Sequence, residues 1–299
     1  MGTSEVISLD DELPGNSEAV KRLRSDIQLA ARTDLPVLFL GESGSGKDVA
    51  ARLVHRLSER RDRAFVAVNL AAIPDSLAAA EMAGYAKGAF TGAERARPGL
   101  FELAEGGTIL LDELDAASLD VQGVLLSVLE AGSIRRLGEA RARALNVRFL
   151  AATNVNLDAQ VEAGRFRPDL VNRVSAIRIR IPPLRERKAD IPVLATAILA
   201  KMSAHFGKSF VLARDAIYAL KSYDFPGNVR ELTNILERAA LLADGSSIDA
   251  AALDLPKPRP RRQVRPGARV QLELAQRQIE ALHRELDALR GSTIPAQPI

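Results

Sequence analysis

A glycine-rich segment with one lysine, Gly41-Glu42-Ser43-Gly44-Ser45-Gly46-Lys47, lies between an apolar run and a helical run of this sequence. The apolar run is Val37–Leu40, and the helical pattern starts near Asp48. Glycines let backbone N–H groups wrap around phosphate oxygens, a following helix N-terminus adds positive potential, and the lysine supplies a full charge. The alternative is a glycine-rich turn with a chance lysine. The strand–loop–helix order favours a phosphate-binding loop, a feature of α/β proteins.

Four further β-rich runs alternate with helical stretches, at residues 65–68, 108–111, 147–151 and 177–181. Strands separated by helices predict a parallel α/β sheet. Val37–Leu40 is continuously apolar, which is typical of a buried central strand. Residues 177–181 alternate isoleucine with arginine, and this pattern predicts a strand that is exposed on one face, at an edge of the sheet.

An apolar run ends in two acids in the segment Thr108-Ile109-Leu110-Leu111-Asp112-Glu113. In a doubly wound sheet, the carboxyl end of such a strand lies beside the phosphate-binding loop. We therefore expect Asp112 to hold Mg²⁺, directly or through water, and Glu113 to polarise the attacking water. An Asp-Glu pair alone is usually solvated surface, but its pairing with the phosphate-binding loop favours a catalytic role.

The sequence divides after Pro182-Pro183, where the β-rich pattern stops. A helical pattern runs from about Asp190 to about Ala243, with turns near Gly207 and Pro226-Gly227. We expect a nucleotide-binding α/β subdomain over 1–183, an all-helical subdomain over 184–255, a basic proline-rich linker over 256–269, an amphipathic helix over 270–290 and a tail over 291–299. The helix carries a heptad pattern that permits a coiled coil, with Leu272, Ile279 and Leu286 at one core position and Ala275, Leu282 and Leu289 at the other.

The composition and charge of the chain argue against several kinds of binding site and partner. The 299 residues carry a net charge of +3, and the nine basic and four acidic residues from Pro256 onward give +5, which leaves about −2 on residues 1–255. The main domain is therefore not expected to coat nucleic acid. The absence of cysteine excludes disulfides, iron–sulfur clusters and thiolate zinc sites. No signal peptide and no apolar run of about 20 residues are evident, so we expect a cytoplasmic location and no membrane partner.

The hexapeptide Gly88-Ala89-Phe90-Thr91-Gly92-Ala93 has the composition of a mobile loop around one aromatic residue. Together with the two nucleotide-handling motifs, it resembles the AAA+ ATPases that activate transcription with the alternative bacterial sigma factor sigma-54. The resemblance covers roughly residues 10–255. Its further motifs, in order along the chain, are Phe65-Val66-Ala67-Val68-Asn69, Ala151-Ala152-Thr153-Asn154, the segment 164–170, Pro183-Leu184-Arg185-Glu186-Arg187 and the segment 225–232.

The resemblance implies a five-stranded AAA+ sheet with a helical lid, ATP and Mg²⁺ as cofactors, and roles for single residues. An acid at position 48 is typical of this family, and Asp48 is expected near the metal beside Asp112. Asn154 resembles sensor I, which reads the γ-phosphate or the attacking water. Asn69 resembles the asparagine that holds the catalytic glutamate inactive, and Arg230 resembles sensor II on the lid.

Arg167 and Arg173 resemble the arginine fingers that reach into the site of a neighbouring subunit. The alternative for either residue is solvated surface or an ion pair with Asp169 or Glu186. A planar cation suits the spread negative charge of phosphoryl transfer, and a cation supplied by a neighbour makes activity depend on assembly. The resemblance implies a homo-oligomeric, hexameric ring.

For the hexapeptide 88–93, the resemblance implies that Phe90 and Thr91 contact sigma-54 in its RNA polymerase holoenzyme when the nucleotide state raises the loop. The residues Ile134-Arg135-Arg136-Leu137-Gly138 match a second, assisting loop. The alternative is an ordinary loop that packs Phe90 into its own core.

Two family features are not evident, a receiver domain and a helix-turn-helix, so DNA binding stays uncertain. The favoured function is an ATP-driven remodeller that opens promoters. The alternative is a nucleotide-dependent regulatory or scaffold protein that acts by partner binding through residues 270–290, without remodelling of sigma-54.

Overall fold

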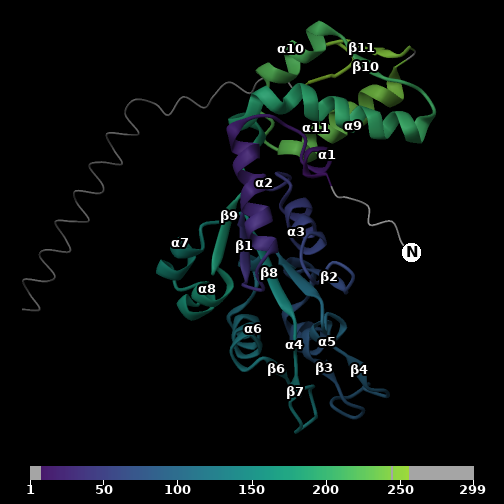
Figure 1. Ribbon diagram of the computed structural model, residues 1–299. Coiled ribbons are helices and arrows are strands. Elements are labelled where there is room, and N and C mark those ends of the chain that lie inside the picture. The colour runs from purple at the N-terminus through teal and green to yellow at the C-terminus, as the bar shows by residue number, and fades with distance from the viewer. Residues whose placement is uncertain (1–7, 244, 256–299) are drawn as a thin grey trace, which may run out of the picture. The chain divides into compact units, whose positions relative to one another are not determined.

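The computed structural model describes residues 8–243 and 245–255. Its centre is a five-stranded parallel sheet in the order β2-β5-β8-β1-β9 (Figure 1). All five runs that the sequence predicts as strands form this sheet, and the α/β prediction is confirmed. The strands are β1 (Val37–Leu40), β2 (Phe65–Asn69), β5 (Thr108–Asp112), β8 (Arg148–Thr153) and β9 (Ile177–Arg180).

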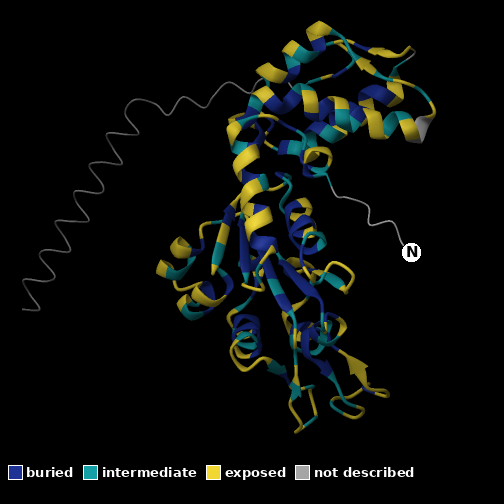
Figure 2. Ribbon diagram, viewed as in Figure 1, coloured by how far each residue is buried: buried dark blue, intermediate teal, exposed yellow. Residues whose placement is uncertain are grey.

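Helices cover both faces of the sheet. Successive side chains of each strand point to opposite faces, so an apolar strand needs helices on both sides to bury them. Phe39 of β1 packs into a core with α2 (Glu18–Ala31) and α3 (Lys47–Arg56). Leu38, the preceding residue, belongs to the core on the other face. Figure 2 shows the central strands as buried and the outer turns of α2 as exposed. The helices of the second face are α4 (Asp75–Ala83), α5 (Leu100–Leu103), α6 (Leu119–Ala131), α7 (Leu157–Glu162) and α8 (Pro168–Val174).

Strand β9 lies at an edge of the sheet, as its alternating sequence predicts. Its Ile179 is fully buried, whereas Arg178 and Arg180 are exposed. Strand β1 lies between β8 and β9 and is buried over its first three residues. This order places the segment that follows β1 beside the carboxyl ends of its two neighbouring strands.

Two short antiparallel ribbons extend from the second face, at the end of the sheet away from the lid helices (Figure 1). One pairs β3 (Gly84–Tyr85) with β4 (Arg97–Pro98) and carries the hexapeptide in its connection. The other pairs β6 (Ser133–Ile134) with β7 (Arg143–Ala144). A bridge between Tyr85 and Leu137 joins the two ribbons.

The lid follows β9 and is helical, with one addition that the sequence did not predict. A two-residue parallel pairing joins β10 (Val211–Leu212) to β11 (Ser247–Ile248), and the fully buried Ile248 anchors it. The predicted turn at Gly207 ends a helix in the left-handed conformation. The lid elements are η3 (Leu184–Asp190), α9 (Ile191–Phe206), α10 (Arg214–Ser222) and α11 (Asn228–Leu242).

Three short elements complete the described fold: α1 (Leu9–Glu12), and the 3₁₀ helices η1 (Leu70–Ala72) and η2 (Leu114–Ala116). Among the described residues, no helix has both the length and the apolarity that a membrane span requires. The predicted linker 256–269, helix 270–290 and tail 291–299 lie outside the described residues.

Candidate functional site

The loop after β1 has the backbone geometry of a phosphate cradle. Gly44 and Gly46 have positive φ angles of 72° and 108°, a conformation that glycine adopts without strain. Helix α3 begins directly afterwards at Lys47, and no side chain caps its N-terminus. The first amides of α3 are thus available for an anion, and the helix dipole favours negative charge at this point.

Lys47 lies where its ammonium can complete this cradle. Its Nζ donates hydrogen bonds to the carbonyl oxygens of Gly41 at 2.8 Å and Glu42 at 3.3 Å. An ammonium has three N–H donors, so one remains for a phosphate oxygen. Burial lowers the pKa of the Lys47 ammonium, and the nearby Asp112 carboxylate opposes this shift.

A cavity of about 240 Å³ lies in front of the cradle. It brings together residues from the loop, from the ends of β5 and β8, and from the lid. This arrangement brings cations and amides that suit phosphates together with carboxylates in one cavity. The sequence-predicted residues that line it are Ser43, Gly44, Gly46, Lys47, Asp48, Asp112, Glu113, Asn154 and Arg230.

The two acids occupy the carboxyl end of β5. Asp112 is the last residue of the strand, and its Oδ1 accepts the Glu113 amide at 2.9 Å. Glu113 has a positive φ of 53°, which marks the point where the chain turns out of the strand. On α3, Asp48 forms an ion pair with Arg52 at 3.0 Å. Carboxylate oxygens beside a phosphate cradle are suited to Mg²⁺, which takes one or two carboxylates and completes its shell with water and phosphate oxygens.

Asn154 and Asn69 lie at the ends of the two strands that flank β5. Asn154 directly follows β8 and lines the phosphate cavity. Asn69 ends β2, in register with Asp112 of β5. Its Oδ1 accepts the Ala71 amide at 2.9 Å and thereby caps η1. Within the described residues, the Asn69 and Glu113 side chains share no hydrogen bond, and the proposed holding of Glu113 remains a prediction.

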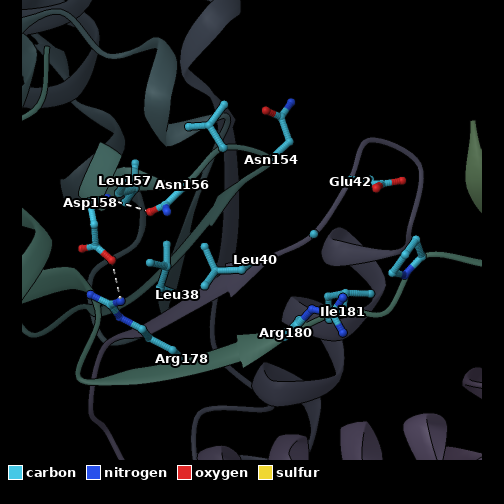
Figure 3. A pocket seen from close by; sticks show the side chains of 13 residues that line it. Leu38, Leu40, Glu42, Asn154, Asn156, Leu157, Asp158, Arg178, Arg180 and Ile181 are labelled. Atoms are coloured by element: carbon cyan, nitrogen blue, oxygen red, sulfur yellow. Dashed lines mark hydrogen bonds and ion pairs between the residues drawn. The ribbon is translucent and has the colours of Figure 1, made fainter. Parts of the chain in front are cut away.

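A second cavity of about 420 Å³ adjoins the first at Asn154 (Figure 3). Leu38 and Leu40 of β1 supply apolar side chains to its wall, and Gly41 and Glu42 of the loop also line it. The guanidinium of Arg178 pairs with Asp158 at 3.3 Å, and Arg180 of the same strand pairs with Glu186 at 2.8 Å. Both cations at this edge therefore already have carboxylate partners.

The lid reaches the phosphate loop through Arg230 and two arginines for which the sequence predicted no role. Arg230 of α11 donates to Ser43 Oγ at 3.1 Å. Arg185 of η3 forms a two-point ion pair with Glu42 at 2.7 and 2.5 Å. Arg187 is buried and donates to the Ser45 carbonyl at 3.2 Å. The sequence indicated them only as part of the motif 183–187 of the family resemblance, because the burial of Arg187 depends on contacts with residues far along the chain.

Arg167 and Arg173 lie outside the phosphate cavity of their own chain. Arg167 forms an ion pair with Asp169 at 2.8 Å, which is the alternative to an arginine finger that the sequence analysis gave for this residue. Arg173 pairs with Glu130 at 3.5 Å and not with Glu186. Arg167 also lines a groove of about 710 Å³ formed largely by α6 and residues 133–137. Both guanidinium groups remain about half exposed, so each can exchange its partner without a large cost.

The hexapeptide 88–93 forms a closed loop at the end of its ribbon. The Gly88 amide donates to the Ala93 carbonyl at 2.8 Å, and the Ala93 amide donates to the Phe90 carbonyl at 3.0 Å. Thr91 is exposed, and Phe90 is 46% exposed. The Phe90 ring makes an edge contact with Tyr85, with 5.0 Å between ring centroids. Phe90 therefore lies on the surface of the described structure and not in its core.

The second loop, residues 134–138, supports the first. The Ala86 amide donates to the Leu137 carbonyl at 2.9 Å, and the Leu137 amide donates to the Gly84 carbonyl at 2.9 Å. A Cβ added at Gly138 would lie 2.9 Å from the Ala89 Cβ, so this position has no room for a side chain. The two loops thus lie against each other through their backbones.

A five-stranded parallel sheet with a phosphate loop after its inner strand β1, and a helical lid that contacts that loop, defines an AAA+ domain. Residues 13–180 match the sigma-54 interaction domain family, and residues 185–264 match the AAA+ ATPase lid domain. The chain belongs to the sigma-54 interaction domain family.

Similar proteins are regulatory proteins by name. The nitric oxide reductase transcription regulator NorR2 of Cupriavidus necator is 49% identical over 243 residues, which are 81% of this chain and 47% of that protein. The Nif-specific regulatory protein of Azotobacter vinelandii is 44% identical, over 81% of this chain and 46% of its own. The response regulator protein PilR of Pseudomonas aeruginosa is 44% identical, over 84% and 57% respectively. This chain spans about half the length of the curated relatives it matches.

Among solved structures, NtrX from Brucella abortus has a similar fold. Its complex with ADP superimposes with a TM-score of 0.75 at 30% identity, covering 84% of this chain and 58% of that one. Its complex with ATP gives a TM-score of 0.74 at 29% identity, covering 83% and 57%.

Proposed function

We propose that this chain hydrolyses ATP with Mg²⁺ in a homo-oligomeric, hexameric ring, and uses the hydrolysis to remodel the sigma-54 RNA polymerase holoenzyme and open promoters. One observation carries the proposal: Phe90 and Thr91 are exposed in the connection of a ribbon, and no residue of 88–93 lines the cavity suited to a nucleoside triphosphate. This separation allows the loop to move against a partner while the phosphate site stays intact. Membership in the sigma-54 interaction domain family supports the choice of partner.

In the phosphate site, the amides at the start of α3 and the remaining N–H of Lys47 bind the β- and γ-phosphates. Asp112, with Asp48 nearby, holds Mg²⁺, which neutralises charge on the phosphate oxygens. Glu113 accepts a proton from the attacking water as the oxygen approaches the γ-phosphorus and ADP leaves. Asn154 orients that water. Arg230 binds the phosphates from the lid.

Three further roles depend on the ring or on the state of the nucleotide site. Arg167 and Arg173 stabilise the transition state in the site of the neighbouring subunit. Asn69 holds Glu113 away from the water until a partner engages. The loop 88–93, with Phe90 and Thr91 at its tip, contacts sigma-54 in one nucleotide state and retracts in another.

The proposal is tested by promoter opening in a purified system. The full chain, ATP, a sigma-54 holoenzyme and promoter DNA are mixed, and unpaired thymines are mapped by permanganate footprinting. We expect melted DNA with ATP and none without nucleotide. ATP turnover with no melting under any condition would reject the remodelling function and leave a regulatory or scaffold protein.

The proposed arginine fingers predict complementation between inactive variants. An Arg167→Ala/Arg173→Ala variant and a Glu113→Ala variant should each lose ATP turnover, because each lacks one half of every shared site. A mixture should recover a measurable part of the turnover, since some interfaces then combine intact Glu113 with intact arginines. Arg165→Ala, which removes an exposed arginine bonded to Gln160, is the matched control and should keep normal turnover. A mixture no more active than its separate components would place the arginines' action within their own subunit.

A further inference from the structure

Asn228, the first residue of α11, joins three segments of the chain. Its side chain is fully buried, and its backbone has a positive φ of 54°. Its Oδ1 accepts the Leu184 amide at the start of the lid at 2.8 Å. Its Nδ2 donates to Glu42 Oε2 at 3.2 Å and to the Ser43 carbonyl at 3.1 Å. One amide thus links η3, α11 and the phosphate loop, with all its polar atoms in use.

The backbone around Asn228 makes a second connection to the same loop. The Gly44 carbonyl accepts the amides of Val229 at 3.0 Å and Arg230 at 3.3 Å. These are N-terminal amides of α11, a helix whose N-cap residue Gly227 supplies no side-chain cap. A carbonyl of the phosphate loop therefore satisfies the backbone N–H groups at the start of α11.

The two segments approach each other more closely than most side chains would permit. A Cβ added at Gly44 would lie 2.4 Å from the Gly227 carbonyl oxygen and 3.0 Å from the Arg230 Cβ. The glycine thus serves both the turn of the phosphate loop and the contact with the lid.

The carboxylate that Asn228 contacts is firmly ionised. Hydrogen bonds from the Arg185 guanidinium, and then from Asn228, lower the pKa of Glu42 to about 2. Near neutral pH, the Asn228 amide therefore donates to a charged acceptor, and such hydrogen bonds are stronger than neutral ones.

We propose that Asn228 is a positioning residue that fixes the lid on the phosphate loop and so holds Arg230 over the phosphate cavity. Asn228 does not line the phosphate cavity. It acts through Arg230, two residues further along α11, whose guanidinium donates to Ser43 Oγ. The inference rests on the proposed binding of ATP. It adds to the proposed site a residue that fixes the position of the Arg230 guanidinium.

A double-mutant cycle on nucleotide affinity tests it, with the full chain and a fluorescent ATP analogue. Asn228→Gly removes the side chain while glycine keeps the positive φ. We expect Asn228→Gly and Arg230→Ala each to weaken binding by ~10-fold, equivalent to about 1.4 kcal/mol. The double variant should be no weaker than Arg230→Ala alone, because Asn228 acts only through Arg230. Losses that multiply to ~100-fold, or unchanged affinity of Asn228→Gly, would overturn the inference.

A second cycle decides the matter if Asn228→Gly does not fold, as judged by circular dichroism. Glu42→Ala removes the carboxylate acceptor from a side chain that is 41% exposed, so the fold should persist. Its loss of affinity should likewise disappear in the Arg230→Ala background, and a loss that persists there would reject the coupling. Asn234→Gly deletes an exposed amide from the same helix and should leave affinity within ~2-fold. A wild-type chain that binds no ATP analogue would refute the proposed function instead, independently of either cycle.

Discussion

Glu113→Ala should retain ATP binding and lose ATP turnover by ~10²-fold or more, because a positioned general base contributes about that factor. The binding groups are separate from this carboxylate: Lys47 bonds to the loop carbonyls, and the first amides of α3 are independent of β5. The measurement is steady-state phosphate release beside equilibrium binding of a fluorescent ATP analogue.

Glu162→Ala is the matched control for that variant. It removes an exposed carboxylate at the end of α7, and its turnover should equal that of the wild type. Wild-type turnover in Glu113→Ala would remove this residue from the mechanism. Loss of binding together with turnover would show instead that the carboxylate maintains the shape of the site.

Phe90→Ala and Thr91→Ala should keep ATP turnover within ~2-fold and lose promoter opening, because neither residue lines the phosphate cavity. An aromatic anchor at a protein interface contributes ~2 kcal/mol or more, so engagement of sigma-54 should weaken at least ~30-fold. Permanganate footprinting measures opening, and phosphate release in the same mixture measures turnover.

The control for this pair is Leu29→Ala, which removes a 63% exposed apolar side chain from α2, on the other face of the sheet. It should change neither quantity. Normal promoter opening by Phe90→Ala and Thr91→Ala would contradict the proposed contact loop, and loss of turnover in either would mean that the loop also affects the phosphate site.

The sequence predicted the sheet because local patterns report burial along a single strand. Val37–Leu40 is apolar on both faces and is an inner strand, whereas the alternation of Ile177 to Ile181 marks the edge. The loop after β1 and the acids after β5 were also predictable from the sequence pattern, since the carboxyl ends of parallel strands meet at one edge of the sheet, whereas the placing of Asn154 and Arg230 came from the family resemblance.

The connections between lid and loop were not predictable from the same patterns. The Gly44 carbonyl binds amides of Val229 and Arg230, nearly two hundred positions later in the chain, and hydrophobic periodicity carries no information on such pairs. Arg187 likewise looks like a solvated cation in the sequence, yet it is buried against Ser45. The pairing of β10 with β11 involves only two residues on each side, which is too short for a period-2 pattern.

The edge contact between Tyr85 and Phe90 favours the conformation in which the loop 88–93 lies against its own ribbon. An aromatic pair of this kind contributes about 1 kcal/mol beyond the area that it buries, so separation of the two rings costs at least about that free energy. The hydrogen bonds within 88–93 join residues of the loop to one another and do not hold Phe90 to Tyr85. Under the proposed function, nucleotide turnover that raises the loop must supply at least the free energy of this ring contact, so the Tyr85 side chain favours the resting conformation of Phe90.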